Sequence, residues 1–91
     1  MKAIWKYKLE ITDNQTVSMP RRSVPLFIGV QNNQPVMWVR IETTLGLTDY
    51  KVRIIGTGHK FMLDNEYKYR GTFQVNNSGV EFVGHVFVED K

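Results

Sequence analysis

The chain has 91 residues, of which 42% are apolar and 23% are charged, a composition typical of one soluble folded domain. It contains no cysteine, which excludes disulfide scaffolds, thiolate metal sites and cysteine nucleophiles. The formal net charge of +3 suits an anionic partner, but it is well below the charge density of a dedicated nucleic-acid-binding protein. We therefore expect a single domain over residues 1–91.

The first expected strands show the apolar–polar alternation, with a period of two, that indicates one buried and one solvated face. Residues 3–11 have apolar side chains at every odd position, and a shorter alternating segment at 17–19 ends at Pro20. Residues 24–31 form the next expected strand. Its Pro25 should lie near the start of the strand or on a sheet edge, because proline cannot donate to a β-ladder.

The middle of the chain continues the pattern. Residues 32–34, Asn-Asn-Gln, predict a hairpin turn, since asparagine tolerates the positive φ of tight turns. Residues 36–43 form the returning strand, and residues 44–49 are expected to form a loop. Another strand follows at 50–55. The expected core face of the returning strand is Met37, Val39 and Ile41.

The C-terminal part begins with a glycine loop at 56–60. Residues 61–65 predict one helical turn or an irregular corner. Strands are expected at 67–75, with Tyr67, Tyr69, Gly71 and Phe73 on one side, and at 80–88, joined by a hairpin turn at 76–79.

These segments amount to six long strands and one short one, without a helical pattern. Short strands separated by turn residues indicate an all-β protein. We expect a compact antiparallel β-sandwich or barrel of about six to seven strands, with consecutive strands paired as hairpins by default.

Several short segments occur in an order that is more specific than any one of them: Lys2-Ala3-Ile4-Trp5-Lys6-Tyr7-Lys8-Leu9, Met19-Pro20, Gln31-Asn32-Asn33-Gln34-Pro35 with Trp38, Gly56-Thr57-Gly58-His59, Tyr69-Arg70-Gly71-Thr72-Phe73-Gln74, and His85-Val86-Phe87. In this order the chain resembles a family of short, uncharacterised proteins encoded mostly in bacteriophage and prophage genomes. The resemblance covers nearly the whole chain. It implies a viral origin and a small stand-alone protein, and it brings no established activity. Many family members have Trp where this chain has Gly84.

The glycine loop is the strongest candidate for a binding site. Two glycines free the backbone to direct N–H groups at one point, and this arrangement holds phosphate or carboxylate oxygens. Thr57 adds a hydroxyl donor, while Lys60 and Arg53 add charge. The competing interpretation is a bulged β-connection, in which the glycines serve backbone geometry alone.

Two other residue sets have an ordinary structural interpretation beside a functional one. His59 and His85 have no further ligands at the spacing of a metal site, so we expect no bound metal. Arginines and aromatics together suggest stacking and phosphate contacts, or else a β core with a solvated edge. The residues of that second set are Arg21, Arg22, Arg40, Arg53, Arg70, Trp5, Trp38, Tyr67 and Tyr69.

The leading hypothesis is a non-enzymatic, phage-type protein that sequesters a phosphate-bearing, nucleotide-like signalling ligand and thereby antagonises host defence. The biological part rests on the resemblance. The predicted ligand-binding residues are Trp38, Arg53, Gly56, Thr57, Gly58, His59, Lys60, Tyr69 and Arg70. Replacing Arg53 or His59 with alanine is expected to leave the fold intact and to abolish binding.

Two alternatives remain open. The first is a protein-binding inhibitor of a host enzyme or nuclease, and the second is a small phosphodiesterase. We expect no cofactor and no catalytic residue. The expected partner is a small anionic ligand or a host protein, in the host cytoplasm, with the chain acting as a homo-oligomer. A membrane is not expected, because no apolar run reaches a spanning length and a patterned strand begins at the N-terminus. Nucleic acid is not favoured either, because no element suits a groove.

Overall fold

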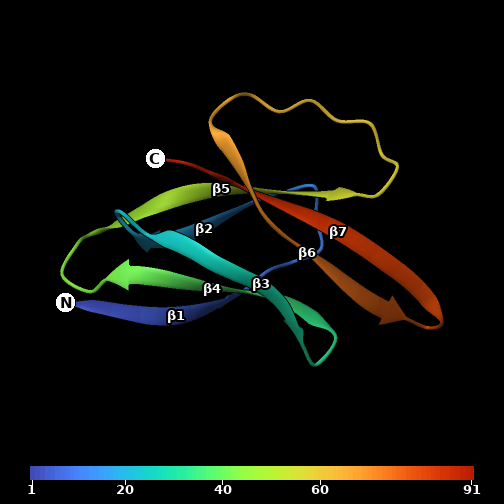
Figure 1. The fold of residues 1–91 in the computed structure, drawn as a ribbon, viewed down its shortest axis with the longest axis horizontal. Coiled ribbons are helices and arrows are strands. Elements are labelled where there is room, and N and C mark those ends of the chain that lie inside the picture. The colour runs from blue at the N-terminus through green and yellow to red at the C-terminus, as the bar shows by residue number, and fades with distance from the viewer.

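The computed structural model describes residues 1–91 and contains seven strands and no helix (Figure 1). The strands are β1 (Lys2–Lys8), β2 (Asn14–Pro20), β3 (Val24–Gln31), β4 (Gln34–Glu42), β5 (Leu47–Gly56), β6 (Tyr67–Asn77) and β7 (Val80–Glu89). No segment forms a helix long and apolar enough to cross a membrane.

The strands form two antiparallel sheets. One sheet has three strands in the order β1-β4-β3, and the other has four in the order β2-β5-β7-β6. The sheets pack face to face without closing into a barrel (Figure 1). The all-β prediction is confirmed, and of its two forms the sandwich is the one observed.

The expectation that consecutive strands pair as hairpins is wrong for most of the chain. Consecutive strands pair at β3–β4 and β6–β7, whereas β1 pairs with β4, β2 with β5, and β5 with β7. The chain changes sheet after β1, after β2 and after β4. These crossings allow each sheet to turn an apolar face toward the other, which sequential pairing within a single sheet of this size does not provide.

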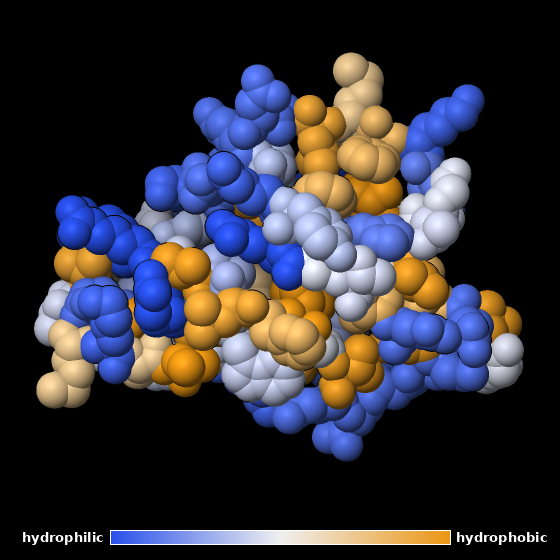
Figure 2. All heavy atoms as spheres, in the orientation of Figure 1, coloured by the Kyte–Doolittle hydropathy of each residue, from blue (hydrophilic) through white to orange (hydrophobic).

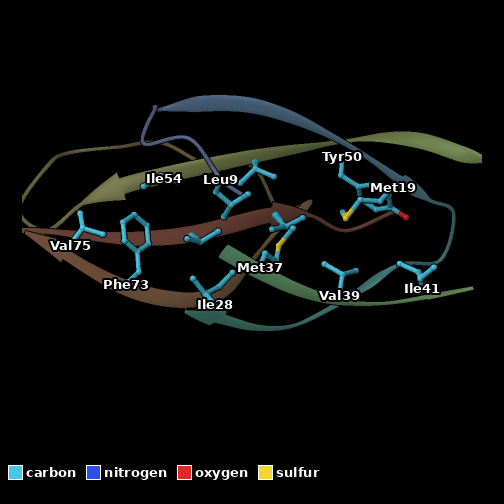
Figure 3. Close-up of a cluster of buried hydrophobic side chains, with 13 residues drawn as sticks. Leu9, Met19, Ile28, Met37, Val39, Ile41, Tyr50, Ile54, Phe73 and Val75 are labelled. Carbon is cyan, nitrogen blue, oxygen red and sulfur yellow. The ribbon is translucent and has the colours of Figure 1, made fainter. Parts of the chain in front are cut away.

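The core lies between the sheets (Figure 3). Met37, Val39 and Ile41 of β4 are at most 1% exposed, which confirms the predicted core face of that strand. The 13 buried residues of this cluster are Leu9, Met19, Ile28, Met37, Val39, Ile41, Tyr50, Val52, Ile54, Phe73, Val75, Val86 and Val88. Because apolar residues from both sheets contribute, burial of this layer is the main stabilising term of the fold.

Turn chemistry accounts for several boundaries. Asn32 and Asn33 have φ values of 52° and 58°, as a two-residue hairpin loop between β3 and β4 requires. Ser78 and Gly79 play the same part between β6 and β7, with φ values of 53° and 80°. Pro25 is the second residue of β3, an edge strand, as predicted.

Some predicted boundaries were displaced. The first strand ends at Lys8 and not at Ile11, because the Gln15 side chain bonds both the N–H and the carbonyl of Glu10 and folds the chain into a turn. Strand β5 begins at Leu47, inside the segment expected to be a loop. The segment 61–65 is an irregular corner without helix, which is one of the two predicted forms.

A bulge in β6 corrects the predicted face of that strand. Tyr69 lies opposite Phe87 and Gly71 lies opposite Val86, so the register shifts by one residue at Arg70. An extra residue in one strand reverses which side chains share a face. Tyr69 is consequently 54% exposed on the outer face, while Phe73 is buried in the core.

Candidate functional site

A hollow of about 280 Å³ lies on the outer face of the four-stranded sheet, where the 57–66 loop leaves β5. This loop is the long yellow connection in Figure 1. On β5 and β7 the inward residues Ile54 and Val86 pair in the core, so the next pair along, Ile55 and His85, faces outward. The residues that line the hollow are Ile55, Gly56, Thr57, Gly58, His59, Phe61, Tyr69, His85 and Phe87.

Three aromatic rings form one wall of the hollow. Phe87 is central: its ring centroid lies 5.8 Å from that of Phe61 and 5.6 Å from that of Tyr69. Both distances are those of favourable aromatic pairs. The three residues come from the loop, β6 and β7, so the hollow forms only when all three are assembled.

A chain of hydrogen bonds crosses the floor of the hollow. The Tyr69 hydroxyl lies 2.5 Å from Thr72 Oγ1, which lies 2.9 Å from His85 Nδ1. His85 Nε2 lies 2.7 Å from Thr57 Oγ1. Since a neutral imidazole has one donor and one acceptor nitrogen, one threonine hydroxyl accepts from the ring and the other donates to it. The imidazole is thereby held at both nitrogens, and Thr57 is joined to β7.

Two amides of the glycine loop make backbone hydrogen bonds within the protein. The Thr57 N–H donates to the Val83 carbonyl at 3.3 Å, and the His59 N–H donates to the Gly56 carbonyl at 3.1 Å. The amides of Gly58 and Lys60 make no such bond and are available to a ligand. Gly58 has a φ of +86°, a conformation that favours glycine.

His59 lies between this hollow and a second one of about 310 Å³. A Cβ atom on Gly56 would lie 2.9 Å from the His59 ring and 3.2 Å from Phe82, so the absence of a side chain at Gly56 lets the imidazole lie against the backbone. Glu81, Phe82 and Val83 complete the lining of the second hollow. His59 is itself exposed and can meet a ligand from either side.

Arg53 ties the loop to the sheet. Its Nε donates to the Asp13 carbonyl at 3.1 Å, and its Nη1 donates to the Met62 carbonyl at 3.2 Å. These bonds hold the far part of the loop beside β5. The guanidinium therefore supports the hollow from outside and does not line it.

The structure brings together five of the nine residues predicted to bind a ligand: Gly56, Thr57, Gly58, His59 and Tyr69. It does not bring in the other four. Arg53 lies outside the hollow. Lys60 is exposed on the loop and does not line the hollow either. Arg70 occupies the bulge of β6 with a buried Nε that has no partner. Trp38 belongs to β4, in the other sheet, and faces away from the core opposite Lys6.

Sequence reasoning missed four residues of this site. His85 and Thr72 supply the hydrogen-bond chain, and Phe87 and Phe61 supply the aromatic wall. His85 and Phe87 are two residues apart on one strand, so strand alternation alone puts them on one face. The missing information was the pairing of β5 with β7, which sets that face beside the glycine loop.

No group of three or more His, Cys, Asp or Glu residues is arranged to hold a metal ion. Comparison with known proteins gave one family. A model described as a domain of unknown function, DUF7352, matches residues 1–91. No curated protein matches the chain, and no solved structure does.

Proposed function

The chain belongs to the DUF7352 family of unknown function, and we propose that it is a binding protein that sequesters a phosphate-bearing, nucleotide-like ligand. The observation that supports this proposal is the hollow itself, where an aromatic wall stands beside a loop carrying free amides, an imidazole and an ammonium group. Ligand sites commonly combine such apolar walls with a few directed polar groups.

The aromatic wall suits the base of the ligand. Phe87, flanked by Phe61 and Tyr69, offers ring surface on which a planar heterocycle can stack. The hydroxyls of Thr57 and Tyr69 are the hydrogen-bonding groups nearest to that base, and the bonds to His85 and Thr72 hold them in place. A volume of about 280 Å³ fits one base and leaves the phosphate at the rim.

The rim suits the phosphate. The free amides of Gly58 and Lys60 supply N–H donors, and the Lys60 and His59 side chains extend from the same turn. Backbone amides with an adjacent cation are a recurrent way of holding phosphate oxygens. Arg53 contributes indirectly, by fixing the loop through the Asp13 and Met62 carbonyls.

The resemblance to bacteriophage and prophage proteins supports the biological part of the proposal. We infer a phage protein that acts in the host cytoplasm, where removal of a signalling nucleotide antagonises host defence. A homo-oligomer fits this role. Phe61 and Met62, 49% and 91% exposed at the loop, offer apolar surface with which a second copy would close the mouth of the hollow.

One contact favours a small phosphodiesterase as the second candidate. The Thr57 hydroxyl lies 2.7 Å from His85 Nε2, a separation at which an imidazole can accept a proton from a hydroxyl. In this case the ligand would be converted and not retained, so recovery of the bound molecule separates the two candidates.

Native mass spectrometry with a panel of cyclic and linear nucleotides tests the proposal. We expect a discrete oligomer that carries a nucleotide at stoichiometric occupancy and releases it unaltered on denaturation. His59→Ala and Lys60→Ala should each weaken binding tenfold or more without changing the fold. Lys68→Ala is the matched control, since Lys68 is a similarly exposed cation of β6 outside the hollow.

Nucleotide affinity that is equal in His59→Ala, Lys60→Ala and wild-type protein would overturn the site. Indifference of the wild type to the whole panel would overturn the function. Release of a hydrolysed product would establish the phosphodiesterase instead.

A further inference from the structure

The outer face of the three-stranded sheet carries an aromatic pair, in which Phe27 is exposed and Trp38 is half-buried. In the register of the sheet, Lys6 of β1 lies beside Trp38 of β4, and Trp38 lies beside Phe27 of β3. The ring centroids of Phe27 and Trp38 are 6.0 Å apart. Phe27 is 63% exposed, and so is Ile4 in the adjacent row. Exposed apolar side chains of this kind, scattered among charged ones, are visible on the side of the molecule drawn in Figure 2.

Positive charge lies beside the pair, on β1 and β4. Arg40 follows Trp38 by two residues on β4 and therefore shares its face, as do Lys2 and Lys8 with Lys6 on β1. Glu42, the acidic residue on this face, is paired with Lys2 at 3.8 Å. At the end of the sheet where Lys2 pairs with Glu42, a hollow of about 380 Å³ is lined in part by Lys2, Arg22 and Arg40.

This distribution distinguishes between possible occupants. A second copy of the chain would bring like charges together, which is unfavourable. The core of a protein–protein interface is depleted of lysine and keeps its charges at the rim. Here the lysine Lys6 adjoins Trp38 at the centre of the face. Cations interleaved with exposed aromatic rings are instead the pattern of surfaces that bind single-stranded nucleic acid.

We propose that this face, formed by Phe27 and Trp38 with Lys2, Lys6, Lys8 and Arg40, binds single-stranded nucleic acid. Unpaired bases stack on the two rings, and phosphates contact the flanking cations. A flat sheet serves this purpose without a helix or ribbon to enter a groove, which was the element that the sequence lacked. The proposal concerns the sheet opposite the nucleotide hollow and does not depend on it.

Fluorescence anisotropy of a labelled 20-mer of thymidylate tests the proposal. We expect Trp38→Ala and Phe27→Ala to weaken binding tenfold or more at fixed salt. Lys68→Ala, at an exposed cation of β6 on the other sheet, is the control and should bind normally. In a Trp5→Phe background the remaining tryptophan is Trp38, and its emission should be quenched by the oligonucleotide.

Salt dependence provides an independent measurement. If three phosphates are contacted, the slope of log K against log [salt] should be about −2, and Arg40→Ala should reduce its magnitude by about 0.7.

The absence of binding at low salt would overturn the proposal. So would equal affinity in wild-type protein, Trp38→Ala and Phe27→Ala, or equal competition by polyglutamate, since either result would mean attraction to charge alone. Loss of oligonucleotide binding in His59→Ala, with Trp38→Ala unaffected, would place the oligonucleotide in the nucleotide hollow. That result would overturn the site on the three-stranded sheet and leave the proposed nucleotide site standing.

Discussion

The two outer faces of the sandwich differ in what covers them. On the four-stranded sheet, the 57–66 loop brings Phe61 against Phe87, and Arg53 fastens the loop at Met62. On the three-stranded sheet no long connection folds back: Phe27 and Trp38 contact each other and remain in solvent to different degrees. The first face contains an open aromatic hollow, and the second presents an aromatic surface without a covering loop.

The polar groups of the two faces differ in the same way. His85 is bonded through both ring nitrogens to Thr57 and Thr72, so its orientation is fixed. Lys6, on the other face, makes a single exposed hydrogen bond to Gln31. A fixed polar group suits selection of one small ligand, whereas mobile cations suit a polymer whose charges repeat. The comparison therefore predicts different responses to substitutions of the same kind.

The largest difference in the free energy of unfolding is expected between alanine substitutions of two glycines that contact aromatic rings. A Cβ at Gly84 of β7 would lie 2.5 Å from Phe73 and 2.9 Å from Ile54, both buried, so Gly84→Ala should destabilise the fold by about 2–3 kcal/mol. A Cβ at Gly29 would lie 2.8 Å from the Trp38 ring, which is half-buried on the outer face and has room to shift, so Gly29→Ala should cost less than about 1 kcal/mol. Urea denaturation with an unchanged m-value measures both.

Gly46→Ala is the control for the glycine pair, because a Cβ there meets nothing within 4 Å. Equal destabilisation by Gly84→Ala and Gly29→Ala would show that the open face is packed as tightly as the core.

A smaller difference in the free energy of unfolding is expected between alanine substitutions of two phenylalanines. Phe87→Ala removes the ring that contacts both Phe61 and Tyr69 and should destabilise the fold by about 1–2 kcal/mol, since this side chain is half-buried. It should also expose the 57–66 loop to limited proteolysis. Phe27→Ala, at a side chain that is 63% exposed, should change stability by less than about 0.5 kcal/mol and leave proteolysis unchanged. An unchanged proteolysis rate in Phe87→Ala would contradict the anchoring role of that ring.

The smallest difference in the free energy of unfolding is expected between substitutions that remove one polar group from each face. Thr72→Val removes the hydroxyl between Tyr69 and His85 and should cost about 1 kcal/mol, because a partly buried ring nitrogen loses its partner. Lys6→Met removes an exposed hydrogen bond to Gln31 and should leave the unfolding midpoint unchanged. The His85 ring resonances in an NMR spectrum should move in Thr72→Val and stay fixed in Lys6→Met. Unmoved resonances in Thr72→Val would exclude the bond to Nδ1.

Sequence reasoning predicted some features of the site better than others. The glycine loop was recognisable because Gly58 and its neighbours depart from strand alternation, and the loop does border the hollow. Tyr69 was assigned to the site, but it was expected to share a strand face with Phe73, because nothing local to residues 67–75 signals that Arg70 is an extra residue in the ladder. Trp38 was grouped with Tyr69 by residue type, although the two lie on different sheets.

By itself, the sequence determined the strands, the turns and the core face of β4, because alternation and turn residues act over a few neighbouring positions. Tertiary structure decided which strands pair. By placing β5 beside β7 it joined Thr57 to His85, and by placing β1 beside β4 it set Lys6 next to Trp38. Pairing depends on burying the apolar faces of distant segments against one another, and the local pattern along any one strand is the same whichever neighbour it has.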